Sequence, residues 1–535
     1  MAVHKAKIPT HGAQEPGSHI IAAIDIGTNS IHLVVAAVNL RGTIKILDTD
    51  KVTVRLGQHV TPDGDIDREG IRKTVTIMRH MKEICSAWSC HIRAIATHAV
   101  REAHNHQQLI EAVFKATRIR IEVVDGDEEG RLVFLGMRHG LALGEKSVLA
   151  LDIGGGSTEI IFGRGQKINY VSSLKLGAVN LSVEYGMMEK VDPQKLASLR
   201  EAIAGRLEAT VEATRTQRFQ MAVASSGTAK ALASINPQTM RVRPGNDANG
   251  LVLRAVDLFA ITEALSRLRN PAAIKAKTGL DSGRSEIILA GAELLSSVTR
   301  ELGVSRWVFS SYGLREGAVI DTWQRLEPDR QSDRIDVREE SIRSFATKLQ
   351  VDRLASAHTV RLALRIFDQL SSWIFAHVSI EDRKHLRRLL EAATQIHDCG
   401  KFISRQAHHR HSYYLIAHSH LPGFTQDERF FMGLIVRFHR KSVPPVAIDP
   451  QLGPDLAADE WAAMRILAGV LRLATALNRT KRRRVRDVVI RRRGVSLQVS
   501  VITSNKSSSA LDLHKARKEI EALEKSWGIR ISLDS

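Results

Sequence analysis

The chain has 535 residues, of which 43% are hydrophobic and 25% are charged, and its formal net charge is +19. This length exceeds what one hydrophobic core usually organises, so we expect two to four domains in a soluble globular protein. Cys85, Cys90 and Cys399 are an odd number without CxxC spacing, which argues against a disulfide framework or a cysteine metal site. The positive charge predicts affinity for polyanions in general, namely nucleic acid, anionic lipid or a phosphate polymer.

Residues 1–19 contain no long apolar run and predict a disordered arm rather than a signal peptide or a membrane span. No later apolar run escapes charged residues for long enough to cross a bilayer, so we expect no transmembrane segment. A cytoplasmic location fits these features and the cysteine content, and it leaves room for peripheral association with a membrane.

An apolar strand over residues 20–26 carries Asp25 near its end. The turn that follows consists of small polar residues and leads into a second strand over residues 31–38. The turn residues are Gly27, Thr28, Asn29 and Ser30. Hydroxyl and amide groups in such a turn are donors for an anion, and the carboxylate is suited to a hydrated cation.

The segment LALDIGGGSTEIIFG, residues 149–163, repeats this arrangement. Asp152 lies 127 residues after Asp25 and is again followed by a turn and a second strand. The turn and the strand start consist of Gly154, Gly155, Gly156, Ser157, Thr158 and Glu159. A glycine-rich hairpin turn is the simpler interpretation of either segment alone. The repeat instead predicts two similar α/β domains whose phosphate-binding turns face one cleft.

Between the repeats, helical spacing covers residues 68–85, and residues 91–96 are a predicted strand that leads to Arg101. A further strand over residues 120–124 precedes a cluster of acids, which consists of Asp125, Asp127, Glu128 and Glu129. These acids are either favourable charges at a helix N-terminus or include a general base beside the cleft.

After the second repeat, residues 193–214 predict a long helix, and a strand over residues 221–224 precedes Ser225, Ser226, Gly227 and Thr228. Hydroxyls and a glycine at the start of a helix form a third potential anion site, although they are also ordinary helix caps. Arg315 opens the last helix of this half. Together these junctions favour a nucleotide or polyphosphate cleft.

Residues 326–338 predict a linker, and the sequence beyond it is helical and rich in histidine. These histidines include His358, His397, His408, His409, His411, His418, His420 and His439. His397 is followed by Asp398, which is the ligand supply of a metal-dependent phosphohydrolase. The acid that would complete such a site is missing, because Thr475 and Asn478 stand where we would expect it.

The end of the chain is strongly basic. Arginines and one lysine crowd residues 481–493, alternation over residues 495–501 indicates a β-hairpin, and residues 516–527 predict a final helix. The charges either form a solvated face or a track for a polyanion.

The segments AAIDIGTNSIHLVVA, THAVREA, GDEEGRL, LALDIGGGSTEI, ASSGTAKAL, GRSEIILAGA and YGLREGAV resemble the exopolyphosphatase/guanosine pentaphosphate phosphatase family, in the family's order. IHDCGKFIS, HRHSYYLIAHS and VRFHRK resemble the helical HD-like domain of the long exopolyphosphatases. The implied fold has two actin-like (ribonuclease H-like) α/β domains around a phosphate cleft, then an all-α HD-like domain and a small α+β domain. We expect these domains over residues 20–136, 137–325, 338–480 and 481–535, respectively.

The resemblance also implies roles for individual residues. Glu129 is the base that orients or deprotonates the attacking water, and Arg101 stabilises charge at the terminal phosphate. Asp25, Asp152 and Glu159 hold Mg²⁺ or Mn²⁺, directly or through water. The phosphate-binding group consists of Thr28, Asn29, Ser30, Gly154, Gly155, Gly156, Ser157, Thr158, Ser226, Gly227 and Thr228.

Two departures from the family pattern limit what the resemblance implies. Without its closing acid, the HD-like group of His358, His397 and Asp398 is a doubtful metal site, and we expect the domain to serve dimerisation and to line a substrate channel. Glu286 stands where relatives often have aspartate.

The expected reaction is hydrolysis of terminal phosphates from inorganic polyphosphate by a homodimer. The alternatives are a guanosine pentaphosphate 5′-phosphohydrolase, for which guanosine pentaphosphate or tetraphosphate is substrate or inhibitor, and a polyphosphate- or nucleic-acid-binding protein. Nucleic acid is not expected as a substrate.

Overall fold

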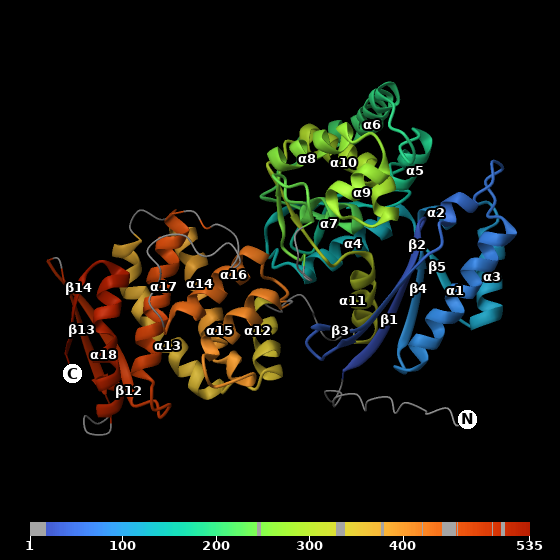
Figure 1. Cartoon of the computed structure of the whole chain (residues 1–535). Helices are drawn as coiled ribbons and strands as arrows, with labels where there is room; N and C mark the ends of the chain where they lie inside the picture. The colour runs from blue at the N-terminus through green and yellow to red at the C-terminus, as the bar shows by residue number, and fades with distance from the viewer. Residues whose placement is uncertain are drawn as a thin grey trace, which may run out of the picture. The chain divides into compact units, whose positions relative to one another are not determined.

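The computed structural model describes residues 18–242, 248–327, 337–375, 379–419, 421–440, 456, 458–494, 496–503 and 509–534. The described residues form two compact units, one up to residue 337 and one from Arg338 onward (Figure 1). Most of the predicted arm and linker, together with His420, lies outside the described residues. None of the described helices is long and apolar enough to cross a membrane.

The first unit contains two sheets with the same strand plan. The first sheet has the order β3-β2-β1-β4-β5, with β1 (His19–Ile26), β2 (Ser30–Val38), β3 (Ile44–Thr53), β4 (His91–Ala96) and β5 (Ile121–Val123). The second has the order β10-β11-β9-β6-β7-β8, with β6 (Ser147–Ile153), β7 (Thr158–Arg164), β8 (Lys167–Leu174), β9 (Met221–Ser225), β10 (Val252–Arg254) and β11 (Arg306–Phe309).

In each sheet an antiparallel meander of three strands is followed by parallel strands. β1 pairs antiparallel with β2 and parallel with β4, and β6 pairs in the same two ways with β7 and β9. The acid of each turn sits near the end of the first strand of its meander, so Asp25 and Asp152 occupy equivalent positions. The sheet plan therefore confirms the internal repeat.

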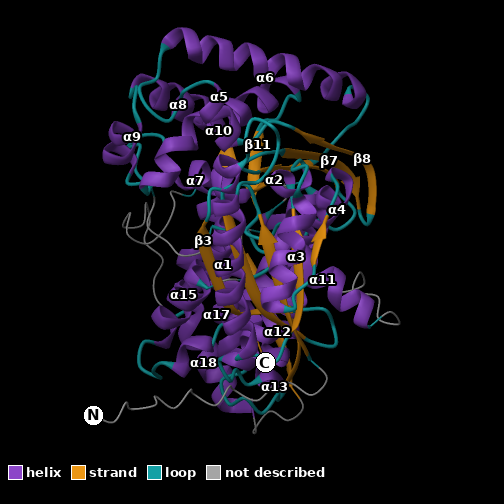
Figure 2. Cartoon of the chain, turned by 90° about the vertical axis from the view of Figure 1, so that its right-hand side faces the viewer, coloured by secondary structure: helices purple, strands orange, loops and turns teal. Residues whose placement is uncertain are grey.

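Helices surround each sheet and divide the first unit into two lobes. Lobe I is the first sheet with η1 (Leu56–His59), α1 (Arg68–Ser86), α2 (His98–Arg101) and α3 (His106–Thr117). Lobe II is the second sheet with α5 (Ala178–Glu184), α6 (Pro193–Thr214), α7 (Ser226–Ser234), α8 (Ala255–Arg267), α9 (Pro271–Thr278) and α10 (Ser282–Glu301). Figure 2 shows α6 along the outer side of lobe II, beyond α5 and α10.

Two further helices cross between the lobes. α4 (Gly126–Gly140) follows β5 but packs on β6, β7 and β8, whereas α11 (Leu314–Leu326) follows β11 but packs on β1 and β2. The two helices also pack closely on each other. The predicted boundary at residues 136 and 137 therefore differs from the packing, because the chain enters lobe II with α4 and returns to lobe I with α11.

Glycines allow the close approach of α4 and α11. A Cβ atom at Gly317 would lie 1.8 Å from the carbonyl oxygen of Leu132, and one at Gly136 would lie 2.1 Å from that of Gly313. No side chain fits between two backbones at this distance, so the crossing depends on both glycines.

The second unit combines helices with a small sheet. Its helical elements are α12 (Val337–Lys348), α13 (Arg353–Ile374), α14 (Ile380–Gln395), η3 (Cys399–Phe402), α15 (His408–His418), α16 (Gln426–Phe438), α17 (Ala458–Leu477) and α18 (Ala510–Trp527). The sheet has the order β12-β13-β14, with β12 (Val485–Arg493), β13 (Ser496–Thr503) and β14 (Arg530–Asp534). Val485, Val488 and Leu497 belong to the same buried core as the helices, so the two last predicted domains share one core.

The glycine crossing predicts opposite effects for two alanine substitutions. Gly317→Ala forces α4 and α11 apart, and we expect it to lower the free energy of unfolding by about 1–3 kcal/mol. Gly205→Ala, on the exposed side of α6 with no neighbouring atom in reach, is the matched control and should raise it by about 0.5–1 kcal/mol. Thermal unfolding followed by circular dichroism measures both. Equal stability of the two variants would contradict the packing described for α4 and α11.

Candidate active site

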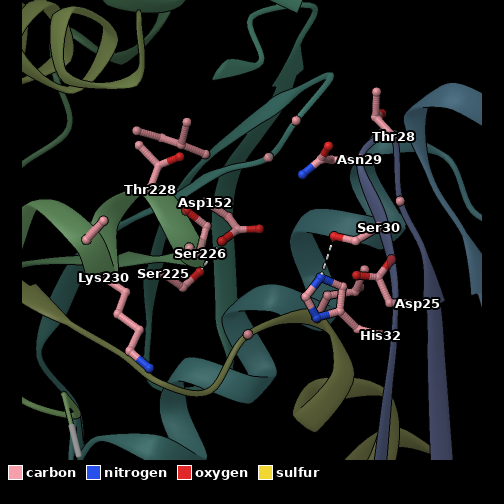
Figure 3. Close-up of a pocket in the computed structure, with 18 of the residues that line it drawn as sticks. Asp25, Thr28, Asn29, Ser30, His32, Asp152, Ser225, Ser226, Thr228 and Lys230 are labelled. Carbon is pink, nitrogen blue, oxygen red and sulfur yellow. Dashed lines mark hydrogen bonds between the residues drawn. The ribbon is translucent and has the colours of Figure 1, made fainter. Parts of the chain in front are cut away.

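A cleft of about 580 Å³ lies between the two lobes of the first unit. Figure 3 shows Asp25, Thr28, Asn29 and Ser30 on the side of lobe I, facing a group that comes from lobe II. The labelled residues of the opposite group are Asp152, Ser225, Ser226, Thr228 and Lys230. The two repeated turns therefore contribute to one site.

The first turn is held from behind by the backbone of residues 54–57. The carbonyl oxygen of Asn29 accepts hydrogen bonds from the amides of Val54 (3.1 Å) and Arg55 (2.8 Å), and that of Thr28 accepts one from Gly57 (2.9 Å). Because these carbonyl groups are satisfied outside the cleft, the side chains of the turn are available to a ligand inside it.

The glycine turn of lobe II, residues 154–156, packs directly against lobe I. A Cβ atom at Gly156 would lie 2.3 Å from the ring of His98 and 2.6 Å from the hydroxyl oxygen of Thr28, so only glycine fits at this position. Behind the turn, the carbonyl oxygen of Gly155 accepts hydrogen bonds from the amides of Val179 (2.9 Å) and Asn180 (3.1 Å). Both turns are thus braced in the same way.

The third turn joins β9 to α7 in a strained conformation. Ser226 has a φ of +88°, which is uncommon for a residue with a side chain and occurs mostly where a site requires it. Next to it, a Cβ atom at Gly227 would lie 2.2 Å from the guanidinium of Arg284, which also donates a hydrogen bond to the hydroxyl of Thr228 (3.1 Å). The turn therefore presents hydroxyls and a guanidinium together.

Among the described residues, five buried or half-buried carboxylates lie in or next to the cleft, namely those of Asp25, Glu129, Asp152, Glu159 and Glu316. Burial raises the pKa of Asp25 to about 7; Arg315 opposes the shift, and the Glu129 and Asp152 carboxylates add to it. Burial, with the same two carboxylates, raises the pKa of Glu159 well above its usual value. A cluster of this kind requires protons or a cation to balance its charge.

Glu129 projects from the first turn of α4 and pairs with the predicted Arg101. The Arg101 guanidinium donates hydrogen bonds to a Glu129 carboxylate oxygen at 2.8 Å and to the carbonyl oxygen of Val124 at 2.9 Å. Burial raises the pKa of Glu129 to about 7, although the hydrogen bond and charge of Arg101 act against the shift. A carboxylate with a pKa near neutrality is suited to general base catalysis.

The carboxylates fit a hydrated divalent cation. Asp25 Oδ1 and Glu159 Oε2 are buried without a hydrogen-bond partner, as expected for oxygens that face a cation. In the described part of the chain, no three His, Cys, Asp or Glu side chains are grouped to ligate one ion directly. Mg²⁺ usually keeps several waters and takes only one or two protein carboxylates with substrate phosphates, which agrees with both observations.

Four cations line the cleft beside the carboxylates, and the sequence analysis missed three of them as ligands: Lys51, Lys230 and Arg284. Burial lowers the pKa of Lys51, and the charge of Arg284 adds to this shift. His32 was also missed; its Nε2 lies 2.8 Å from the hydroxyl of Ser30, and burial together with Arg315 lowers its pKa to about 3. Lys230, Arg284 and His32 lie in the segments ASSGTAKAL, GRSEIILAGA and AAIDIGTNSIHLVVA, so a sequence signal for them was present, whereas Lys51 lies outside these segments and only the fold reveals its position.

Most of the predicted phosphate-binding residues line the cleft, with one correction. Lining residues are Thr28, Asn29, Ser30, Gly154, Gly155, Gly156, Ser157, Ser226, Gly227 and Thr228. Thr158 is fully buried and its hydroxyl donates a hydrogen bond to the carbonyl of Leu176, so it does not bind phosphate from this position. Glu286 forms an ion pair between the two lobes, in which Arg55 Nη2 lies 3.2 Å from Glu286 Oε2.

In the second unit, Asp398 is surrounded by cations and histidines. His408 Nε2 lies 3.3 Å and His397 Nε2 3.6 Å from Asp398 Oδ1, and Lys481 Nζ lies 3.3 Å from Asp398 Oδ2, which also contacts Lys401. Although burial opposes it, these neighbours hold the pKa of Asp398 well below its usual range. The two lysines therefore balance the charge of this buried carboxylate.

His358 has other neighbours. Its Nδ1 contacts Arg361 at 3.3 Å, and its Nε2 is buried without a hydrogen-bond partner. The relation of this unit to HD-type phosphohydrolases stays a prediction.

The chain is similar to known phosphatases along most of its length. Residues 33–326 match the Ppx/GppA phosphatase family, and residues 337–520 match domain III of the Ppx/GppA phosphatases. The chain is 25% identical to a guanosine-5′-triphosphate,3′-diphosphate pyrophosphatase from Vibrio vulnificus over 87% of this chain and 88% of the relative. It is 26% identical to a protein of the same name from Pseudoalteromonas atlantica over 89% of each chain.

Solved structures agree for the first unit. A Ppx/GppA family member from Aquifex aeolicus is 25% identical with a TM-score of 0.51, over 58% of this chain and 99% of that one. An exopolyphosphatase from Cytophaga hutchinsonii is 25% identical with a TM-score of 0.53, over 59% of this chain and 99% of that one.

The raised pKa of Glu129 predicts a pH dependence of stability in protein freed of divalent cations. The pKa is about 7 in the folded chain against a usual 4.5, so folding takes up a proton between these values and stability falls as pH rises from about 5 to 7.5. Glu129→Gln should remove on the order of 1–3 kcal/mol of this fall. Thermal unfolding at both pH values measures it, with the exposed Glu301→Gln as control. A fall of the same size in Glu129→Gln and wild type would contradict the assignment.

Proposed function

The chain belongs to the Ppx/GppA phosphatase family of phosphoanhydride hydrolases, and we propose that its own reaction is the release of terminal phosphates from inorganic polyphosphate. The observation that carries the proposal is the composition of the cleft wall. Lys51, Lys230, Arg284 and Arg315 all line the cleft, next to the three turns. Several cations around one cleft suit a polymer with about one charge per phosphate.

The described part of the same wall has few benzene rings on which a nucleobase could stack. Among the described residues that line the cleft, Phe309 is the one with a benzene ring, and it is buried at 4% exposure. Recognition of a guanine base commonly uses an exposed aromatic or guanidinium face for stacking. Because Arg284 and Arg315 present guanidiniums in the same lining, the shortage of benzene rings favours a substrate made of phosphates but does not decide against a nucleotide.

In the proposed reaction, the terminal phosphoryl group lies between the turns of the two lobes. Amides and hydroxyls of residues 28–30, 154–157 and 226–228 bind its oxygens, and Arg101 adds a positive charge next to them. Glu129 orients the attacking water and accepts its proton, for which a pKa near 7 is suitable. When bound by Asp25, Asp152 and Glu159, Mg²⁺ or Mn²⁺ supplies charge neutralisation for the phosphate oxygens.

A guanosine pentaphosphate 5′-phosphohydrolase is the second candidate. Two curated relatives, which match almost 90% of the chain, carry the name guanosine-5′-triphosphate,3′-diphosphate pyrophosphatase. The reaction would use the same turns and the same base on a shorter substrate. Substrate preference therefore needs a direct comparison of the two compounds.

The role of Glu129 predicts a selective loss of turnover. Glu129→Gln removes the base but keeps the size of the side chain, and we expect kcat for long polyphosphate to fall by about 10²–10⁴. Polymer binding should change little, because the turns and cations remain. Asp127→Asn, an exposed acid two residues earlier on α4, is the matched control and should keep wild-type turnover. Phosphate release and filter binding measure the two properties, and equal losses in both would argue against a base.

The cationic wall predicts a dependence on chain length. Lys51→Gln combined with Lys230→Gln should raise KM for long polyphosphate by about tenfold and leave KM for guanosine pentaphosphate within about twofold, because fewer phosphates reach the wall. A parallel assay of both substrates at low and physiological salt measures this. If the wild type cleaves pentaphosphate faster than polyphosphate, the two candidates change rank.

A further inference from the structure

Asp321, on α11, forms ion pairs with arginines from three elements. Its Oδ2 lies 2.6 Å from Arg93 Nη1 on β4 and 2.7 Å from Arg325 Nη2 on α11 itself. Its Oδ1 lies 2.6 Å from Arg131 Nη2 on α4. We name Asp321, Arg93 and Arg131 the crossing cluster, because they join the two helices that cross between the lobes.

Two members of the crossing cluster are buried, whereas the side chain of Arg131 is 39% exposed. The side chains of Asp321 and Arg93 are 9% and 6% exposed. Burial would raise the pKa of Asp321, but hydrogen bonds from Arg131 and Arg93 hold it below its usual value. A buried carboxylate that loses such partners becomes strongly unfavourable, so each arginine has little freedom to leave its position.

Each of the three joined elements carries part of the proposed catalytic group. Strand β4 leads within five residues to Arg101, and α11 begins with Leu314 and Arg315 at the cleft. On α4, Arg131 lies two residues after Glu129 and also binds the side chain of Glu128 at 2.6 and 2.9 Å. The first turn of α4 is therefore tied to β4 and α11 at the position of the base.

Packing between α4 and α11 supplies only part of the restraint on the first turn of α4. The crossing of α4 and α11 is made by backbone against glycine, at Gly136 and Gly317, without interlocking side chains at these two points. The two helices also share a buried apolar core that contains Leu132, Leu135 and Val319, and apolar packing of this kind has no fixed direction that opposes sliding along the helix axis. A charged cluster with fixed hydrogen-bond directions resists such sliding.

We propose that Asp321 is a positioning residue of the hydrolytic site, which holds Arg131 and Arg93 and thereby sets Glu129 against Arg101. The inference rests on the proposed function of Glu129 as the base. It goes further in naming a residue outside the cleft, on a helix that follows Glu129 by almost two hundred positions in the chain, as a determinant of turnover. Substrate binding by the turns does not depend on this cluster.

The first test compares two variants, each of which removes one arginine partner of Asp321. Arg131→Gln releases α4 from Asp321, whereas Arg325→Gln removes a partner that belongs to α11 itself and joins no second element. We expect Arg131→Gln to lower kcat for polyphosphate about tenfold with KM within about twofold, because misplacement of a catalytic group affects turnover before binding. Arg325→Gln should keep kcat within about twofold.

A second pair separates positioning from stability. Asp321→Asn removes the charge at the centre of the cluster. Glu293→Gln removes a carboxylate of similar burial on α10, which binds Arg200 of α6 at 2.6 and 2.9 Å. Both should lower the unfolding temperature, but only Asp321→Asn should lower kcat at 25 °C, by about tenfold or more. An unchanged kcat in Asp321→Asn, or the same loss in Glu293→Gln, would overturn the inference.

Hydrogen exchange gives a readout that does not need turnover. Amides of residues 126–132 should exchange faster in Arg131→Gln and Asp321→Asn than in wild type, and at the wild-type rate in Arg325→Gln and Glu293→Gln. A wild type that releases phosphate from neither substrate refutes the proposed function, and exchange then decides the positioning role. Unchanged exchange in Arg131→Gln and Asp321→Asn refutes the inference, whatever the activity.

Discussion

The burial of several carboxylates at one cleft is the constraint on which the first unit depends. Burial is the largest cause of the raised pKa values of Asp25, Glu129 and Glu159, and repulsion from neighbouring carboxylates adds to it. Such a group is stable only with protons or cations, and the cleft also contains lysines and arginines that repel each other. Acids and cations on the same wall are compatible when an anionic substrate and a hydrated cation lie between them. The site is therefore complementary to a metal-bound phosphate chain rather than to either partner alone.

Much of the first unit was predictable because its signals are local. Strand patterns next to small polar residues located both turns, and the repeat of Asp25 at Asp152 identified two equivalent sheets. The helix over Pro193–Thr214 and the strand over His91–Ala96 have the predicted bounds. Local hydrogen bonding and periodicity decide such elements, so one stretch of sequence is sufficient.

Other features depend on contacts between distant segments. Thr158 looks like a phosphate ligand in sequence, but the pleat of β7 turns its hydroxyl toward Leu176. Lys51 belongs to an ordinary strand and reaches the cleft only through the fold. The final helix starts at Ala510 rather than at residue 516, and α4 and α11 exchange lobes. No local pattern records which sheet a helix covers, because either sheet offers it an apolar face.

The exchange of α4 and α11 also has a consequence for how the chain acquires its structure during synthesis. One face of the first sheet, with Ile21 and Val34, packs against Val319 and Trp323 of α11. These residues leave the ribosome only after nearly all of lobe II has been made. One apolar face of lobe I therefore stays uncovered while lobe II is synthesised. The two lobes complete their cores together rather than in chain order. The core that contains β1 is complete only when α11, the last helix of the first unit, packs against it.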